Sequence, residues 1–512
     1  MLNSDIEGAR KYHNATKHSY ESVRTSLHRM DWEIQPLPFK IYTTLEPIPL
    51  PREAPVSQVP ALEAIAGEAP LPSPGEAVPD LLMLSRLLYF SNGVTKHRKN
   101  QGGEHWFRAA ACTGALYHIE LYLVCRALPG LEAGVYHFSA HDLALRRLRA
   151  GDFRGVLVQA TGGDHSVAAA PALLVSTGTF WRNAWKYQAR SYRHSFWDSG
   201  TILANLLAVA AAHRLPARVV AGFVDGAVNA LLGLDEQREV ALEVVPLGYG
   251  PSSPAGPPPR LEPLDLPTEP LSKREVDYPL IREMHGASCL ASVEEAAAWH
   301  GAASPAPLPP PQGALYPLAL AGPETPAEPV EQVILRRGST RQFALRPVTF
   351  QQLSLVLDRA AGGIPADFLG PGASLNDLYL IVHAVDDLPP GAYVFHRDRR
   401  ALELLKEGAF RGHAAHLGLG QELPGDASFN VYMLCDLERT LGSFGNRGYR
   451  AAELEAGIIG GRLYLGAYAV GLGASGLTFY DDDVTAFFSP HAAGKSVMFL
   501  VAVGKAARLP RP

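Results

Sequence analysis

The sequence has few cysteines, and their spacing excludes two common kinds of scaffold. Four cysteines occur in 512 residues, and none forms a CxxC pair or a Cys/His cluster along the chain; they are Cys112, Cys125, Cys289 and Cys435. This pattern argues against a structural zinc site and a disulfide framework, and it is typical of a reducing compartment. From the sequence we predict no metal site.

The sequence also lacks a basic block, a long apolar run and the common nucleotide-binding signatures. The formal net charge is only −5, which does not favour a nucleic-acid partner. The longest apolar run, residues 201–212, is too short to span a bilayer, and the polar N-terminus does not resemble a signal peptide. No P-loop, dinucleotide fingerprint or Ser-His-Asp signature stands in a convincing setting. We expect a cytoplasmic protein without a membrane partner.

What the sequence does contain is a long internal repeat at a constant offset of 257 residues. The matched sets are Gly134, Tyr136 and Phe138 with Gly391, Tyr393 and Phe395; Gly151, Phe153, Arg154 and Gly155 with Gly408, Phe410, Arg411 and Gly412; and Arg190, Tyr192, Arg193 and Gly200 with Arg447, Tyr449, Arg450 and Gly457. A period of this length indicates a duplicated domain, since solenoid repeats have periods of roughly 20–50 residues. Two such domains should pack as a pseudo-twofold pair, as a homodimer would.

The repeat and the composition divide the chain into four segments of an α+β protein. Residues 1–79 read as an N-terminal arm followed, over 52–79, by a loose Pro-, Ala- and Glu-rich surface loop. Residues 80–250 and 331–512 read as two similar domains. Between them, residues 251–330 hold 18 of the 42 prolines, which favours stiff linkers. The helical spacing of residues 275–300 predicts a helix that docks on the domains.

The two copies differ at a pair of ionisable residues just before a long buried helix. Lys186-Tyr187 stand in the first copy, where Ser443-Phe444 stand in the second. A partly desolvated lysine near arginines can have a lowered pKa and accept a proton near neutral pH. On the residues alone, a surface lysine beside a packed tyrosine is the favoured interpretation. Because Arg190 and Arg193 persist in both copies, we predict a structural role for them.

Three further stretches have both a functional and a structural interpretation. Arg336–Arg341 can surround a phosphate with charge-assisted bonds, or form a solvated helix end; its counterpart by pattern retains only Lys40. Gly471–Gly476 can let the backbone approach a ligand closely, or it can be a plain helix-to-strand turn; in the first copy, residues 214–216 stand where residues 471–473 stand in the second. Cys112–Tyr117 is a small-residue turn that suits a flat ring, although turn formation alone also explains it.

Taken together, these motifs resemble the nitroreductase-like flavoproteins, in particular the SagB/ThcOx-type dehydrogenases, which include oxidases that convert peptide azolines into azoles. The resemblance covers both repeats. It includes the opening Tyr12–Ser19, the Arg-x-Ser-x-Arg element, the glycine run, the turn that ends in Gly114-Ala115-Leu116-Tyr117, and the Lys-Tyr pair. It implies two nitroreductase-like FMN-binding domains in tandem, paired within one chain as an intramolecular pseudo-dimer.

The resemblance also implies one composite flavin site. The second domain would hold FMN through Arg337, Ser339, Arg341, Gly473, Ala474, Ser475 and Gly476, and the first would cover it with Thr113, Gly114, Ala115 and Leu116. Lys186 and Tyr187 would be catalytic. The opposite pseudo-site, with Lys40, residues 214–216 and Ser443-Phe444, is expected to be degenerate, so that one FMN binds per chain.

The expected function is an FMN-dependent dehydrogenase that oxidises a carbon–heteroatom bond in a small molecule or modified peptide, with Lys186 removing a proton. Two alternatives stay open: an NAD(P)H-dependent nitro- or quinone-reductase, and a flavin-binding scaffold without turnover in a peptide-modifying complex. Cys112 and Thr113 stand where Pro-Ser is usual in the family, which leaves the substrate open.

Overall fold

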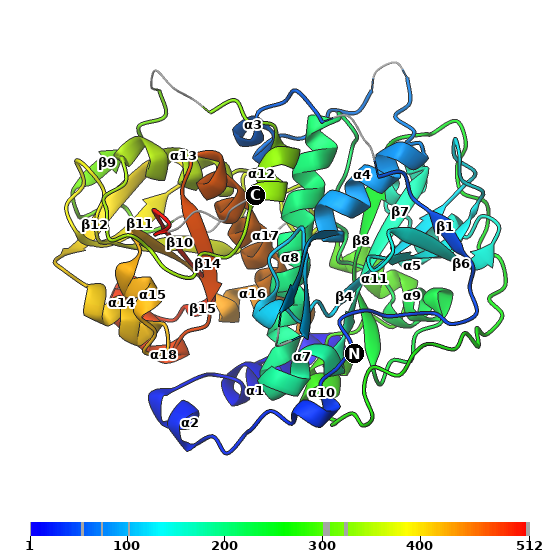
Figure 1. Ribbon diagram of the computed structural model, residues 1–512, viewed down its shortest axis with the longest axis horizontal. Coiled ribbons are helices and arrows are strands. Elements are labelled where there is room, and N and C mark those ends of the chain that lie inside the picture. The colour runs from blue at the N-terminus through cyan, green and yellow to red at the C-terminus, as the bar shows by residue number, and fades with distance from the viewer. Residues whose placement is uncertain are drawn as a thin grey trace.

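The computed structural model describes residues 2–52, 56–72, 75–100, 103–300, 308–321 and 326–507. Two β-sheets stand on either side of a central pair of long helices, α8 and α17 (Figure 1). The N-terminal helices lie together with α10 at one end of this central pair, while α3 and α12 lie at the other. No helix in the described part of the chain is long and apolar enough to cross a membrane.

The first half of the chain forms a six-stranded sheet, a separate hairpin and nine α-helices among the described residues. The strands are β1 (Pro47–Pro49), β2 (Val94–Asn100), β3 (Gly103–Arg108), β4 (Ile119–Cys125), β5 (Gly134–Ser139), β6 (Ala144–Ala150), β7 (Ala172–Thr179) and β8 (Glu239–Leu247). The helices are α1 (Glu7–Ala15), α2 (Tyr20–Thr25), α3 (Ala61–Ile65), α4 (Leu81–Asn92), α5 (Arg154–Ala160), α6 (His165–Ala169), α7 (Phe180–Tyr187), α8 (Ser191–Ala212) and α9 (Asp225–Leu232).

The second half forms a seven-stranded sheet with its own helices. The strands are β9 (Leu315–Pro317), β10 (Asn376–Val382), β11 (Gly391–His396), β12 (Ala401–Glu407), β13 (Phe429–Cys435), β14 (Gly473–Leu477) and β15 (Ser496–Gly504). The helices are α10 (Pro279–Ala287), α11 (Val293–Trp299), α12 (Val330–Arg336), α13 (Phe350–Ala360), α14 (Arg411–Leu417), α15 (Glu422–Asp426), α16 (Leu437–Phe444), α17 (Arg447–Ala469) and α18 (Asp481–Phe488).

The two sheets share one strand order, as the internal repeat predicts. The order β6-β5-β4-β7-β8 in the first sheet corresponds to β12-β11-β10-β13-β15 in the second, and all neighbouring strands are antiparallel. The α+β class is therefore confirmed. The hairpin β2–β3 belongs to the first half only, because residues 361–375, all described, contain no hairpin.

Local sequence signals set the ends of several helices. The Asp80 carboxylate accepts the Met83 N–H at the start of α4, and Thr349 and Gln352 form a capping box at the start of α13. Pro279 opens α10, where its missing N–H costs no helical hydrogen bond. Within the segment 275–300, Ile281, Met284 and His285 of α10 are buried.

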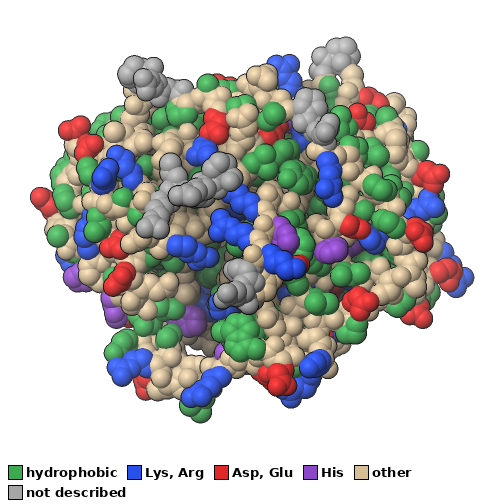
Figure 2. Space-filling view, in the orientation of Figure 1, with side chains coloured by type: hydrophobic (Ala, Val, Ile, Leu, Met, Phe, Trp, Pro, Cys, Tyr) green, Lys and Arg blue, Asp and Glu red, His purple; other side chains and the backbone are tan. Residues whose placement is uncertain are grey.

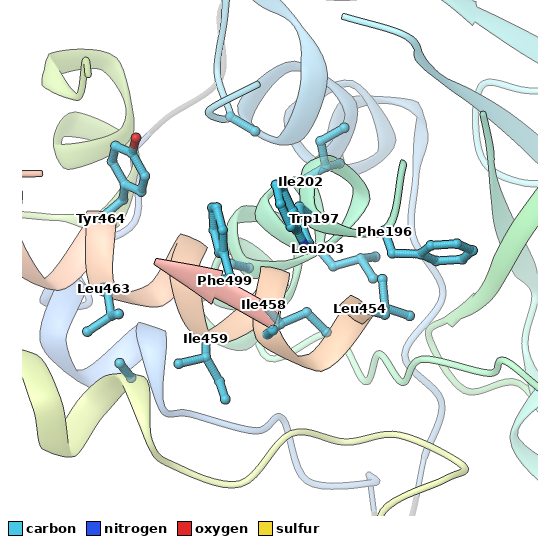
Figure 3. Close-up of a cluster of buried hydrophobic side chains, with 14 of the residues drawn as sticks. Phe196, Trp197, Ile202, Leu203, Leu454, Ile458, Ile459, Leu463, Tyr464 and Phe499 are labelled. Carbon is cyan, nitrogen blue, oxygen red and sulfur yellow. The ribbon is translucent and has the colours of Figure 1, made fainter. Parts of the chain in front are cut away.

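Helices α8 and α17 cross where two glycines of the repeat meet. A Cβ added at Gly200 would lie 2.6 Å from the Gly457 Cα, and one added at Gly457 would lie 2.7 Å from the Trp197 carbonyl oxygen. Side chains of both helices and Phe499 of β15 surround this crossing (Figure 3), and Trp197 stacks on Phe499 with ring centroids 5.0 Å apart. The repeated glycines therefore allow the backbones to approach closely.

The two halves also exchange buried ion pairs. Arg190 and Arg193 of the first half donate to the Asp481 carboxylate at 2.9 and 2.7 Å. In the reverse direction, two arginines of the second half, Arg447 and Arg450, donate to Asp225 at 2.6 and 2.7 Å. This reciprocity agrees with the predicted structural role of the arginines and with pseudo-twofold packing.

One expectation is wrong: the region 52–79 is not wholly a loose surface loop. Its helix α3 buries Ala61, Leu62, Ala64 and Ile65, and the Ala61 N–H donates to the Glu328 carbonyl just before α12. The proline-rich composition concealed this short helix, whose stability comes from tertiary packing rather than from its own propensity.

Candidate active site

Lys186 and Tyr187 end α7, at the rim of the first half. Both side chains are half-buried, and the Lys186 Nζ lies 5.2 Å from the centre of the Tyr187 ring. The next residue, Gln188, has φ 50° and ψ −143°, a conformation that is essentially restricted to glycine. Its counterpart is Gly445, with φ 67° and ψ −162°. The ionisable pair is thus held beside a strained backbone, whereas Ser443-Phe444 are not.

Burial shifts the pKa values of the two groups in opposite directions. Burial lowers the pKa of Lys186, and the positive charge of Arg341 lowers it further. Burial raises the pKa of Tyr187 well above its usual value, and the Asp198 and Cys112 groups contribute in the same direction. At neutral pH the tyrosine is therefore a neutral phenol, and the lysine loses its proton more readily than a solvated one.

The small-residue turn from Cys112 to Tyr117 lies against Tyr187. Thr113–Ala115 form a single 3-10 turn, and Gly114 has φ 67°. The Asp198 carboxylate accepts the Thr113 N–H at 2.9 Å and its hydroxyl at 2.8 Å. A Cβ added at Gly114 would lie 2.7 Å from the Tyr187 Oη, so only glycine permits this approach.

The second half contributes the Arg-x-Ser-x-Arg element beside this turn. Arg337 is buried and donates from Nε to the Ala109 carbonyl of the first half at 2.9 Å. Ser339 Oγ lies 3.3 Å from the Tyr464 Oη. Arg341 is exposed and close enough to Lys186 and Tyr187 to affect the pKa of both. The structure therefore brings the predicted phosphate clamp of one half to the Lys-Tyr pair of the other.

Three residues in this region were missed by sequence reasoning. Tyr464 of α17 contacts Ser339, lies under the Arg337 guanidinium at 5.7 Å, and bonds to the Gly476 N–H. Burial lowers the pKa of Lys96 of β2, and the nearby positive charge of Arg337 lowers it further. Lys505 follows β15 and pairs through its backbone with Ala344. Only tertiary contacts identify them, because none belongs to a local motif.

Lys and Arg side chains gather near the middle of the face shown in Figure 2. Among the described residues, no acidic partner forms a salt bridge with Lys96, Lys186, Arg337, Arg341 or Lys505. Lys186 of the first half lies near Arg341 of the second, and Lys96 lies near Arg337. Cations that approach one another from both halves without an acidic partner suit an anionic group such as a phosphate. The residues present therefore fit a flavin mononucleotide, whose ring would lie by the Gly114 turn.

The glycine run adopts a different structure from the expected open loop. Gly473–Leu477 form β14, an edge strand paired with β15. A Cβ at Gly473 would overlap the Thr340 Oγ1, and the Thr340 N–H donates to the Ala474 carbonyl at 2.9 Å. Gly473 thus packs on the clamp segment, while Ala474 and Ser475 are buried. β14 is an edge strand, but its outer row of backbone groups is partly occupied, because the Ala474 carbonyl accepts from Thr340 and the Gly476 N–H donates to Tyr464.

The opposite pseudo-site differs from the expectation in its cation. Lys40 is not there, because it pairs with Glu239 at 2.6 Å inside the first half. Matching α3 with α12, from Ala61 and Val330, gives Glu68 the place of Arg337. A cavity of about 900 Å³ is lined by Trp299 and by Ser443 and Phe444, the counterparts of Lys186 and Tyr187. An acidic residue in place of the clamp arginine does not favour a phosphate there.

Comparison with known proteins agrees with this architecture. Residues 105–249 match the model of the nitroreductase family. A nitroreductase candidate of Methanocaldococcus jannaschii is 27% identical over 163 residues, which cover 30% of this chain and 81% of that protein. The microcin B17-processing protein McbC of Escherichia coli is 33% identical over 138 residues, 26% of this chain and half the length of McbC.

One crystal structure is similar over nearly the whole chain. It is a nitroreductase candidate from Anabaena variabilis, with a TM-score of 0.78 and 27% identity, and the match covers 98% of this chain and 99% of that one. Such coverage means that both sheets and the connecting segments have counterparts there. Residues 105–249 therefore form a nitroreductase-family domain, and the chain as a whole is similar to a nitroreductase candidate over nearly its full length.

Proposed function

We propose that this protein is an FMN-dependent dehydrogenase that removes two hydrogens from a ring containing carbon and a heteroatom, such as an azoline ring in a peptide-derived substrate. The observation that carries the proposal is the meeting of Lys186 and Tyr187 from one half with Arg341 from the other. Nitroreductase-family proteins generally bind flavin, and the similarity to McbC, a microcin-processing protein, supports a peptide-derived substrate.

The residues of both halves would share the binding of the cofactor. Arg337, Ser339 and Arg341 would hold the phosphate, β14 would face the ring from one side, and the turn Thr113–Leu116 would lie on the other. When bound, FMN would supply the redox chemistry, as the acceptor of a hydride (two electrons with one proton) from the substrate carbon. The charge of the clamp matches a phosphate dianion, which is why the cations need no acidic partner.

Lys186 and Tyr187 would have separate tasks in this reaction. The lowered pKa of Lys186 increases its neutral fraction, so that its Nζ can take the proton released by the substrate. Tyr187, whose pKa is raised, keeps its proton and can donate a hydrogen bond to the substrate heteroatom. Its contact with Gly114 fixes the ring beside the turn.

We infer one FMN per chain. Glu68 occupies the place of Arg337 at the opposite position, and Ser443-Phe444 replace the Lys-Tyr pair. Release and quantification of flavin from the purified protein tests this inference. Two FMN per chain would contradict it, and none after incubation with FMN would favour a degenerate scaffold that binds no flavin.

The mechanism is tested with Lys186→Met. Mixing the flavin-loaded protein anaerobically with a peptide that carries a thiazoline ring should bleach the flavin absorbance. The variant should keep the flavin and bleach about 10²–10⁴ times more slowly, the usual contribution of a general base. Lys273→Met, at an exposed position, is the matched control and should behave like the wild type. Equal rates in Lys186→Met and wild type would refute the role of Lys186.

A second candidate function is an NAD(P)H-dependent nitro- or quinone-reductase, which the whole-length similarity to the Anabaena variabilis protein favours. Such an enzyme needs an open ring face but no dedicated base. Rapid NADPH oxidation with a nitroaromatic acceptor, unchanged in Lys186→Met, would support this reductase. Slow NADPH oxidation together with thiazoline-driven bleaching would support the dehydrogenase.

A further inference from the structure

A buried cluster of three potential metal ligands lies directly beneath the turn that contacts Tyr187. The ligand atoms of Cys112, His118 and Asp198 all lie within 4.8 Å of one another. The Cys112 Sγ is 3.0 Å from the Asp198 Oδ2, and the His118 Nδ1 is 3.5 Å from the same oxygen. In tetrahedral zinc sites with bonds of about 2.0–2.3 Å, neighbouring ligand atoms lie roughly 3.3–3.8 Å apart. The histidine–carboxylate pair has this spacing, whereas the thiol–carboxylate pair, which is a hydrogen bond here, would lengthen when an ion replaces its proton.

His118 provides a second, independent sign of a missing partner. Its side chain is fully buried, yet neither ring nitrogen has a hydrogen-bond partner. Buried polar groups are nearly always bonded, so an imidazole left without partners beside a thiol and a carboxylate calls for another ligand. A small cavity of about 10 Å³, lined by Cys112, Tyr117 and Asp198 among others, adjoins the cluster and has room for about one water.

The charges of the cluster also suit a divalent cation. A thiolate at Cys112 and a carboxylate at Asp198 would together balance a 2+ ion, which makes a neutral assembly in a buried place. The Tyr117 N–H donates to the Cys112 sulfur at 3.0 Å, a bond that stabilises a thiolate. The nearby Arg182 is already paired with Glu120 at 2.6 Å.

Two comparisons within the chain separate this cluster from ordinary buried polar groups. In the second half, Leu375 stands in the place of His118 and Glu455 in that of Asp198. Both carboxylates accept backbone N–H groups of their own turns, and the difference is that the second half has a leucine where the first has the imidazole. A second triad, Asp225, His285 and Cys289, is different because two arginines already neutralise Asp225. In the first triad, by contrast, no arginine or lysine of the described residues forms an ion pair with the Asp198 carboxylate. Its ion-pair contact is with His118 of the same triad.

We propose that Cys112, His118 and Asp198 bind one divalent transition-metal ion of the zinc type. Mixed thiolate, imidazole and carboxylate ligands are typical of zinc, and a water in the adjoining cavity would be the fourth ligand. Binding replaces the thiol proton, which leaves to solvent, so uptake weakens at low pH. The ion would fix the turn Cys112–Tyr117, whose Gly114 packs on Tyr187.

The test uses the full chain, treated with a chelator, incubated with excess ZnCl₂ and then desalted. We expect about one zinc per chain by elemental mass spectrometry. Zinc K-edge absorption should show one sulfur at about 2.3 Å and nitrogen or oxygen atoms at about 2.0–2.1 Å. Neither readout depends on flavin or on turnover.

Matched variants complete the experiment. His118→Leu copies the residue that the second half uses at this position, and Cys112→Ser removes the sulfur with little change in volume; each should retain at least tenfold less zinc. Cys289→Ser, in the other triad, should retain zinc like the wild type. Circular dichroism establishes whether each variant is folded. If His118→Leu is not folded, the comparison of Cys112→Ser with the wild type is sufficient for the test. Wild-type zinc no higher than in Cys112→Ser, or zinc without a sulfur neighbour, would overturn the proposal.

Discussion

Asp481→Asn should destabilise the pairing of the two halves, and its effect should depend on pH. Asp481 is 3% exposed and accepts bonds from Arg190 and Arg193, which come from the other half. Burial alone would raise its pKa, but the two arginines outweigh that effect and lower it from 3.8 to about 2. The substitution keeps the shape of the side chain and removes its charge.

The pKa shift sets the magnitude of this effect. The difference between 3.8 and about 2, at 1.36 kcal/mol per pKa unit, corresponds to about 2.4 kcal/mol. Removal of one member of a buried ion pair typically costs about 3–5 kcal/mol, because the partner charge is left unpaired. We therefore expect Asp481→Asn to lower the free energy of unfolding by about 2–5 kcal/mol at pH 7.

The sign of the pH dependence follows from the lowered pKa. A carboxylate whose pKa is depressed in the folded state stabilises the protein fully above the unfolded value of 3.8. That stabilisation is lost as the pH falls through the folded value of about 2. The difference between wild type and Asp481→Asn should thus be constant from pH 7 to about 5 and shrink between about pH 4 and 2.

The assay is urea unfolding, followed by tryptophan fluorescence and by far-ultraviolet circular dichroism across this pH range. Asp225→Asn is the matched variant, since Asp225 holds the corresponding pair of arginines from the other half, and it should show a loss of the same order. A loss below about 0.5 kcal/mol at pH 7, or a loss that does not change down to pH 2, would refute the reasoning.

Three further predictions concern the crossing and the site. Gly457→Ala should lower the free energy of unfolding by about 1–3 kcal/mol in urea titrations, because the new methyl group would meet the Trp197 carbonyl oxygen at 2.7 Å; an unchanged midpoint would contradict the close crossing. Arg341→Gln should move the pH profile of flavin reduction to higher pH, since loss of that positive charge raises the pKa of Lys186. A pH profile that does not move would show that the charge of Arg341 does not act on Lys186. Gln188→Gly should raise the free energy of unfolding by about 1 kcal/mol, as glycine relieves the strain at φ 50°, and a loss in thermal unfolding would argue against that strain.

Much of the fold was predictable because the repeat places identical side chains at matching points. Gly200 and Gly457 recur in the sequence, and they prove to be the crossing of α8 and α17. Arg190 and Arg193 recur as well, and they prove to be interface ion pairs. The assignment of Lys40 to the opposite pseudo-site was wrong. It aligned Lys40 with the clamp arginines by sequence pattern alone, whereas in the structure helix α3, and not the segment around Lys40, corresponds to α12, which precedes the clamp.

The candidate site was only partly predictable. Lys186, Arg337 and Arg341 were identified by local motifs, and the structure brings them together, although their roles and the domain boundaries stay predictions. Tyr464 and Lys96 belong to no motif, so only their packing beside the clamp reveals them.

The sequence by itself determined the α+β class, the two similar units and the asymmetry between Lys186-Tyr187 and Ser443-Phe444, because these depend on residue identity and on spacing along the chain. Only the tertiary structure shows which residues of the first half lie beside which residues of the second. It also placed Cys112, His118 and Asp198 in one cluster, although the cysteine spacing had argued against a metal site. Ligand geometry and charge pairing depend on distances in space, and residues 86 positions apart in the chain, such as Cys112 and Asp198, can lie 3.0 Å apart once the chain has folded.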